Sequence, residues 1–197
     1  MLICLALTGC QTAHVSRPLT SDLGSNDPGE QLEFWDKLAE QSVTSNDDAF
    51  HGLLMFLDGD DPASDYAGRV RELKHRRMLP QGFDQPAERA VDRGTLAVAL
   101  LKALKIQGGL ALRVFGPSPR YAVRELMFLN VYPPSTPNQS FSGNEFVGII
   151  GRVEDYQRGN PDNVAATVMP EQMKQQGGGE KGDFAAPVTP TKEPNVQ

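Results

Sequence analysis

The chain has 197 residues, of which 39% are hydrophobic and 7% aromatic, and this is enough to bury one modest core. Its formal net charge of -6 argues against nucleic acid and against an anionic membrane surface as partners, because both require clusters of basic residues. No run beyond the N-terminus approaches the roughly 18 apolar residues that span a bilayer.

The N-terminus carries an apolar run over residues 2–7, which leads into Leu7-Thr8-Gly9-Cys10. These four residues resemble the lipobox of bacterial lipoproteins, in which small residues precede a cysteine that is alkylated by diacylglycerol. The resemblance implies that residues 1–9 are a removable signal peptide and that Cys10 anchors the protein in a membrane. The residue after Cys10 is Gln11 and not aspartate. For bacteria with two membranes, the resemblance therefore implies an outer-membrane location. The alternative is a short buried strand or helix that ends in Gly-Cys.

Two polar segments flank the predicted domain. Residues 10–29 are rich in proline, glycine and serine, so we expect a flexible linker of about 25 Å average length behind the lipidated cysteine. Residues 158–197 have few large apolar side chains and no periodicity, so we expect a disordered tail. The folded domain is predicted over residues 30–157.

Six helices are predicted in chain order. Their apolar residues recur at helical spacing, and serine, asparagine, aspartate or proline stands at their starts. They cover about residues 28–39, 45–57, 62–79, 92–104, 118–130 and 142–156. Ser142 and Glu145 form a predicted capping box for the last helix. Residues 110–114 have the composition of a strand, but a single strand has no partner, and the predicted fold is all-α.

The predicted helices also form a repeat. Three sets of residues align at separations of 46 and 50 positions, with a cap in the first set and apolar side chains in the others: Asn46, Asp92 and Ser142; Phe50, Leu96 and Phe146; Leu54, Leu100 and Ile150. A single helix pair cannot bury its apolar stripe, and neighbouring pairs must pack together to cover it. The alignment therefore predicts three helix-pair repeats packed as a compact bundle, with the capped helix second in each pair. Coincidence among ordinary amphipathic helices is the alternative.

One motif resembles a known repeat. The segment at residues 91–97, Val-Asp-Arg-Gly-Thr-Leu-Ala, is similar to the start of the second helix in S-layer homology repeats, which are about this long and occur in threes. The resemblance implies a central helical bundle and a groove in which Arg93 binds an anionic cell-wall polysaccharide. The other two units have Asp47 or Asp48, and Asn144, at the matching place and would lack the cation. Arg93 is thus the binding candidate, with a surface ion pair to Asp92 or Glu88 as the alternative.

Candidate catalytic and metal-binding residues are few. His14 lies in the predicted linker, His51 lies beside apolar residues, and His75 lies in the basic run 69–77, which we interpret as a solvated helix face. The acidic run 58–61 differs from a calcium loop, because glycine takes its second position and Arg69 stands where a bidentate glutamate is required. The sequence therefore predicts a protein that is not an enzyme and that holds no metal and no cofactor.

Together these features predict a non-catalytic, lipid-anchored cell-envelope protein that tethers or scaffolds through its helical domain. The expected partner is cell-wall polysaccharide or an envelope protein, and nucleic acid is not expected. An accessory lipoprotein subunit of an export or outer-membrane assembly complex is the alternative. An enzyme of an unrecognised kind is the third hypothesis, and loss of activity on mutation of His51 or His75 is its test.

Overall fold

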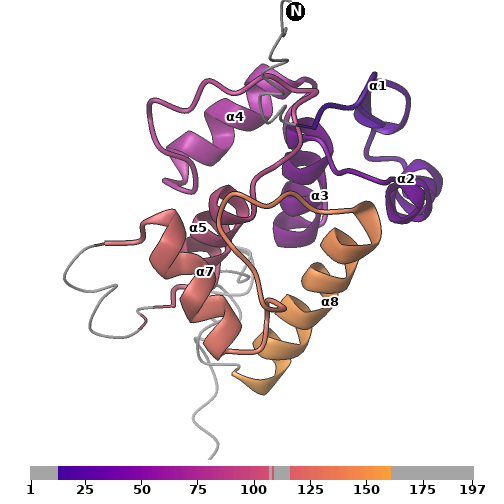
Figure 1. Ribbon diagram of the computed structural model, residues 1–197. Helices are drawn as coiled ribbons and strands as arrows, with labels where there is room; N and C mark the ends of the chain where they lie inside the picture. The colour runs from indigo at the N-terminus through magenta and orange to yellow at the C-terminus, as the bar shows by residue number, and fades with distance from the viewer. Residues whose placement is uncertain (1–12, 107, 109–115, 161–197) are drawn as a thin grey trace, which may run out of the picture. The chain divides into compact units, whose positions relative to one another are not determined.

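The computed structural model describes residues 13–106, 108 and 116–160, and every regular element within them is a helix (Figure 1). The helices are α1 (Thr20–Leu23), α2 (Pro28–Glu40), α3 (Asn46–Asp58), α4 (Tyr66–His75), α5 (Arg93–Ala103), α7 (Pro119–Phe128) and α8 (Gly143–Gly159). Extended pairing in the described residues is limited to two isolated bridges, His14 with Arg89 and Ser45 with Ala90. The all-α prediction is confirmed for this part of the chain, where no helix is both long and apolar enough to cross a membrane.

Side-chain caps fix where several helices begin. The Ser45 hydroxyl accepts a hydrogen bond from a backbone amide in the first turn of α3. Ser142 and Glu145 form the predicted capping box of α8. Asp92 stands at the start of α5 as predicted, but its side chain makes no capping bond and lies 3.3 Å from the guanidinium of Arg89 instead.

The starts of α3, α5 and α8 converge around three equivalent residues, each of which immediately precedes an N-cap. These residues are Thr44, Val91 and Phe141. The amide of Val91 donates to the carbonyl of Thr44 at 3.0 Å, and the amide of Thr44 donates to the carbonyl of Phe141 at 2.9 Å. Each helix therefore begins against the segment that leads into another helix.

The first amides of these three helices have no partner inside their own helix. They donate to carbonyls a few residues before the N-cap of the next unit: Asn46 to Arg89, Asp47 to Ala87, Arg93 to Gln139, Gly94 to Pro137, and Gly143 to Gln41. The pattern runs from the first unit to the second, from the second to the third, and from the third back to the first. This cyclic pattern confirms the three-repeat architecture.

The ends of α4 and α7 repeat as closely as the starts. In each, one leucine carbonyl accepts two amides from the residues that follow the helix: Leu73 from Met78 and Leu79, and Leu126 from Val131 and Tyr132. The residue before these amides adopts a left-handed conformation, with φ of 60° at Arg77 and 58° at Asn130. The two helices also share an Arg-Glu-Leu tripeptide just before these equivalent turns, at residues 71–73 and 124–126.

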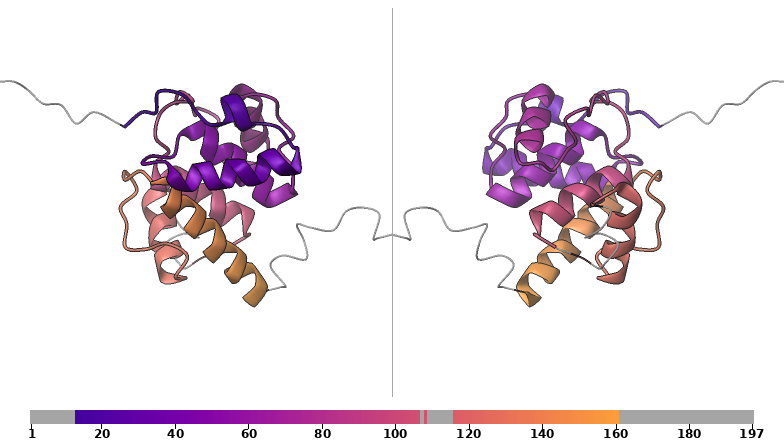
Figure 2. Two further views of the ribbon diagram at one scale, coloured as in Figure 1. Left: turned by 90° about the vertical axis from the view of Figure 1, so that its right-hand side faces the viewer. Right: turned by 90° about the vertical axis from the view of Figure 1, so that its left-hand side faces the viewer.

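The helices pair differently from the prediction. Consecutive helices were expected to pair with the capped helix second, but α3 packs against α4, α5 packs against α7, and α8 packs against α2 (Figures 1 and 2). The capped helix is thus the first member of each pair. Because α2 covers the apolar stripe of α8, the beginning of the domain completes the last repeat.

The predicted core positions are buried. Leu96, Leu100 and Phe146 are 0% exposed and Ile150 is 8% exposed. The register of the first unit differs by one residue, because Ser45 and not Asn46 is the cap. The residues equivalent to Leu96 and Leu100 are therefore Ala49 and Leu53, not Phe50 and Leu54, although all four are buried.

The segment before α2 differs from the predicted flexible linker. The amide of Ala90 donates to the carbonyl of Ala13, and the amide of Val15 donates to the carbonyl of Glu88, both at 2.9 Å. Helix α1 follows within the same segment. The folded domain therefore includes the residues from 13 onward and does not start at residue 30. At the other end α8 continues to Gly159, while the predicted strand at 110–114 and nearly all of the predicted tail lie outside the described residues.

Candidate functional site

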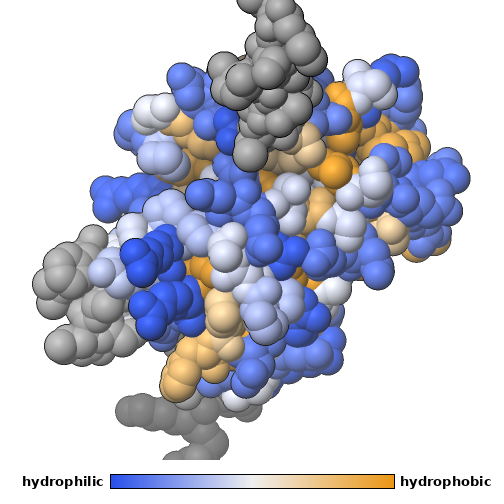
Figure 3. Space-filling model, in the orientation of Figure 1, coloured by the Kyte–Doolittle hydropathy of each residue, from blue (hydrophilic) through white to orange (hydrophobic). Residues whose placement is uncertain are grey.

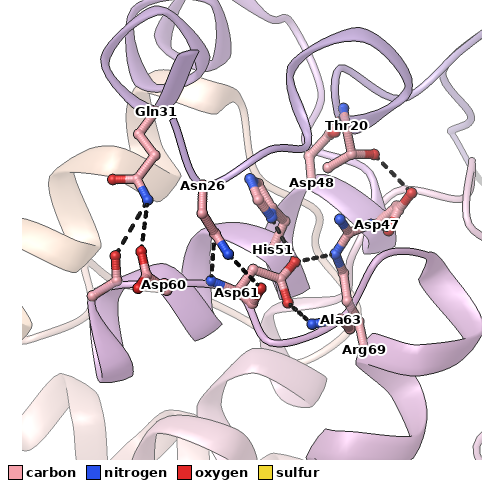
Figure 4. A network of polar contacts seen from close by, with 11 residues as sticks. Thr20, Asn26, Gln31, Asp47, Asp48, His51, Asp60, Asp61, Ala63 and Arg69 are labelled. Carbon is pink, nitrogen blue, oxygen red and sulfur yellow. Dashed lines mark hydrogen bonds and ion pairs between the residues drawn. The ribbon is translucent and has the colours of Figure 1, made fainter. Parts of the chain in front are cut away.

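The most concentrated polar chemistry in the described residues is a buried cluster of Asp47, His51, Asp61 and Arg69 (Figure 4). His51 Nδ1 donates to Asp61 Oδ2 at 2.6 Å, and Arg69 Nε donates to the same oxygen at 2.5 Å. Arg69 Nη1 donates to Asp47 Oδ1 at 2.7 Å. The side chains of His51 and Asp61 are 0% exposed, and that of Arg69 is 2% exposed. One guanidinium thus joins two carboxylates inside the fold.

The adjacent carboxylates of Asp47 and Asp48 extend this cluster toward α1 through hydrogen bonds from Thr20. The Thr20 hydroxyl donates to Asp47 Oδ2 at 2.7 Å, and the Thr20 amide donates to Asp48 Oδ1 at 3.1 Å. The Ser45 hydroxyl donates to the other oxygen of Asp48 at 2.7 Å. These bonds attach α1 to the first turn of α3, which explains why the segment from residue 13 to residue 29 packs on the domain.

The two ends of the network respond differently to burial. Burial opposes ionisation of Asp61, but hydrogen bonds from His51 and Arg69 outweigh it and hold the pKa of Asp61 below its ordinary value. At Asp48 burial dominates over the hydrogen bond from Ser45, and its pKa is raised. The cation Arg69 therefore keeps Asp61 ionised, while Asp48 has no such partner.

The buried cluster is closed to substrate. His51 Nε2 is buried and has no hydrogen-bond partner, and the imidazole ring meets the ring of Phe34 edge-on at 4.7 Å between centroids. This nitrogen is out of reach of solvent and of a reacting group, because the whole His51 residue is 0% exposed. The cluster joins α1, α3, α4 and the 59–63 turn, and its chemistry is that of a structural ion pair.

Arg93, predicted to lie in a ligand-binding groove, has a buried side chain that is bonded within the protein. Its side chain is 7% exposed, and its nitrogens donate to the Ser140 carbonyl, the Ser135 hydroxyl and the Glu145 carboxylate at 3.1, 2.7 and 2.6 Å. The guanidinium carbon also lies 4.8 Å from the ring centroid of Phe141. Each of the three nitrogens donates within the protein, so Arg93 ties the start of α5 to the third unit, and its guanidinium is largely withdrawn from solvent.

The remaining candidates are dispersed. The carboxylates of the acidic run diverge, since Asp58 pairs with Arg76, Asp60 accepts from Gln31, and Asp61 faces the buried cluster. No group of three or more potential metal ligands lies close enough to hold an ion within the described part of the chain. Cys10 lies outside the described residues.

The basic run divides between two faces of α4. Arg69 enters the buried cluster, and Arg76 pairs with Asp58 and Glu72. The other basic residues, Arg71, Lys74, His75 and Arg77, line an open groove of about 630 Å³ together with Ala67, Val70 and Gln81. The interpretation of the whole run as one solvated face is therefore wrong for Arg69.

A second groove, of about 460 Å³, lies where α2, α3 and α8 meet. Its apolar lining comes from Trp35, Met55, Phe56 and Ile150, and its polar lining comes from Gln31, Gly59, Glu154 and Gln157. The ring of Trp35 stacks on Phe146 at 6.4 Å between centroids, so the floor of this groove rests on the core. We call it the α2/α3/α8 groove.

Comparison of the chain with protein-family models, curated proteins and solved structures finds no match. The site must therefore be interpreted from its own geometry. Sequence reasoning did not predict the buried cluster, because its members come from α3, a turn and α4. The available local signal was the spacing of Asp47 and His51, which stand four positions apart on α3.

Proposed function

We propose that the protein is a lipid-anchored component of a bacterial cell envelope, attached through Cys10, and that its helical domain binds an envelope protein. The lipobox-like residues 7–10 support the anchor. The observation that carries the binding role is the α2/α3/α8 groove, which combines a floor of buried and partly buried aromatic and aliphatic side chains with amide and carboxylate groups. Such a lining suits a peptide segment, which offers apolar side chains and backbone hydrogen-bonding groups together.

Binding is preferred to catalysis because of where the titratable groups lie. The Asp61, His51 and Arg69 side chains are enclosed, and the Arg93 guanidinium is occupied by the protein. A protein partner is preferred to a cell-wall polysaccharide for a similar reason. Arg93, the residue that the S-layer resemblance offered for an anionic sugar, has a side chain that is 7% exposed and already paired with Glu145. A tether or an accessory subunit of an envelope complex both fit this mode of binding.

The anchor is tested by mass spectrometry and detergent phase partition of the native protein. We expect Cys10 to carry lipid at a new N-terminus and the protein to enter the detergent phase, because several acyl chains bind a membrane stably where one binds only marginally. Cys10→Ser should remain unprocessed and leave that phase. An unmodified Cys10 in the native protein contradicts the anchor.

The groove is tested by affinity capture from solubilised envelopes with three forms of the chain. Phe56→Lys places a charge in the α2/α3/α8 groove, and Leu32→Lys places the same charge on α2 at a residue that is 66% exposed and does not line the groove. A partner protein captured by the unaltered chain and by Leu32→Lys, but lost with Phe56→Lys, supports the proposal. If no partner protein is captured and all three forms sediment equally with purified sacculi, the proposal is contradicted and a wall polymer is favoured as the ligand.

A further inference from the structure

The basic residues that line the groove on α4 form no ion pair with a carboxylate of the described residues. We call Arg71, Lys74, His75 and Arg77 the α4 basic face. The ion pairs formed by described residues of α4 and its C-terminal turn involve Arg69 and Arg76 and none of these four. Lys74 donates to the backbone carbonyl of Phe83 at 2.7 Å, which fixes its position without neutralising its charge. The basic face is thus a positive patch on a chain of net charge -6. The net charge, which argued against an anionic membrane surface as a partner, does not describe this local cluster.

The equivalent helix in the second unit shows that the fold does not require this charge. Cations near a helix C-terminus interact favourably with the helix dipole, which offers a local reason for basic residues at the end of α4. Yet α7 ends in the same turn, with the same pair of amides on one leucine carbonyl, and has no basic residue in its last turn. Three of the four basic residues are replaced there, Lys74 by Met127, His75 by Phe128 and Arg77 by Asn130, whereas Arg71 is matched by Arg124. The charge on α4 therefore calls for an explanation other than helix capping.

The position of the anchor provides that explanation. Ala13 is hydrogen-bonded to the domain, and only three peptide units separate it from Cys10, so the Cα atom of Cys10 can lie at most about 11 Å from that of Ala13. The 80–90 loop connects the α4 basic face to the point where Ala13 is attached, because Gln81 lines the basic groove and Ala90 is hydrogen-bonded to Ala13. Helices α1 and α4 lie at one end of the unit and α7 and α8 at the other (Figures 1 and 2). The visible surface over α4 carries hydrophilic residues interspersed with apolar ones (Figure 3).

We propose that the α4 basic face binds the phosphate groups of anionic phospholipids in the leaflet that holds the Cys10 anchor. This inference rests on the proposed lipid anchor and adds an orientation to it. A short tether brings the end of the domain that carries α4 to the bilayer, where each arginine or lysine near an anionic surface strengthens binding about fivefold. The α2/α3/α8 groove, which includes α8 residues at the opposite end, is then left open to a protein partner.

The test is co-sedimentation of the full chain carrying Cys10→Ser with phosphatidylcholine vesicles, prepared with and without phosphatidylglycerol. We expect phosphatidylglycerol to increase binding and high salt to abolish the increase, because salt screens exposed charges. Arg71→Glu with Arg77→Glu should lower the partition more than about tenfold. The matched control is Arg120→Glu with Arg124→Glu, two exposed arginines on α7, of which Arg124 is the repeat equivalent of Arg71. It should bind as the unaltered chain does.

Equal partition of the two double variants, or binding that phosphatidylglycerol does not increase, overturns the proposal. A single-stranded oligonucleotide forms a third arm. If Arg71→Glu with Arg77→Glu loses only oligonucleotide binding, the face recognises nucleic acid and the membrane proposal is wrong. Because Cys10→Ser is present throughout, these outcomes do not depend on lipidation, which mass spectrometry of the native protein tests separately. Thermal unfolding of each variant confirms that loss of binding is not loss of the fold.

Discussion

Removal of the Arg69 charge should expose how much the buried cluster contributes to stability. In Arg69→Met the two carboxylates of Asp47 and Asp61, whose side chains are 11% and 0% exposed, lose their guanidinium. Breaking a buried ion pair from one side costs about 3–5 kcal/mol, because the remaining charge stays away from water. For a domain of this size each kcal/mol lowers the melting temperature by about 2–4 °C, so we expect a decrease of about 6–20 °C.

The assay is urea unfolding near neutral pH, followed by the fluorescence of Trp35, the one tryptophan of the chain. The matched control is Arg76→Met on the C-terminal turn of the same helix, since Arg76 also bonds two carboxylates but is 25% exposed. Exposed pairs contribute about 0–1 kcal/mol, so the control should change little. Equal losses in the two variants, or a loss below about 1 kcal/mol in Arg69→Met, refute the reasoning.

The pH dependence checks the cause of the effect. The pKa of Asp61 is lower in the folded protein than the ordinary unfolded value of about 3.9, so its stabilising contribution is present above that pH and is lost as the pH falls through the folded pKa. Arg69→Met removes part of that contribution. The difference in unfolding free energy between the unaltered protein and the variant should therefore narrow in acid, and a difference that stays constant down to about pH 3 would show that the ionised Asp61 is not its source.

Two further substitutions test the packing of the repeats. Gly143→Ala should destabilise by about 3 kcal/mol or more in thermal unfolding, because the added Cβ would lie 1.5 Å from the carbonyl oxygen of Leu38, whereas Gly151→Ala on the same helix meets nothing within 4 Å and should be neutral or stabilising. Leu100→Ala should cost about 2–5 kcal/mol, because that side chain is 0% exposed, whereas Leu32→Ala at a position 66% exposed should change the melting temperature little.

Local signals in the sequence determined the helices and much of their core. Spacing of Leu96 and Leu100 on one helix face, and the capping box of Ser142 and Glu145, depend on residues within a few positions of one another. Such interactions are written into the periodicity of the chain, so the all-α class and the repeat could be predicted. The lipobox-like Cys10 is local in the same sense, and it stays a prediction.

The tertiary structure alone decided which charges are free. Four arginines with the same intrinsic chemistry have different surroundings. Arg69 and Arg93 are enclosed by carboxylates and carbonyls from distant segments. Arg76 is paired at the surface, and Arg71 faces an open groove. A guanidinium is less available to a ligand when it is buried and paired, and its pairing depends on residues up to 52 positions away, such as Glu145 for Arg93. Sequence spacing does not encode contacts of that range, which is why the ion pair of Arg93 with Glu145 could not be predicted.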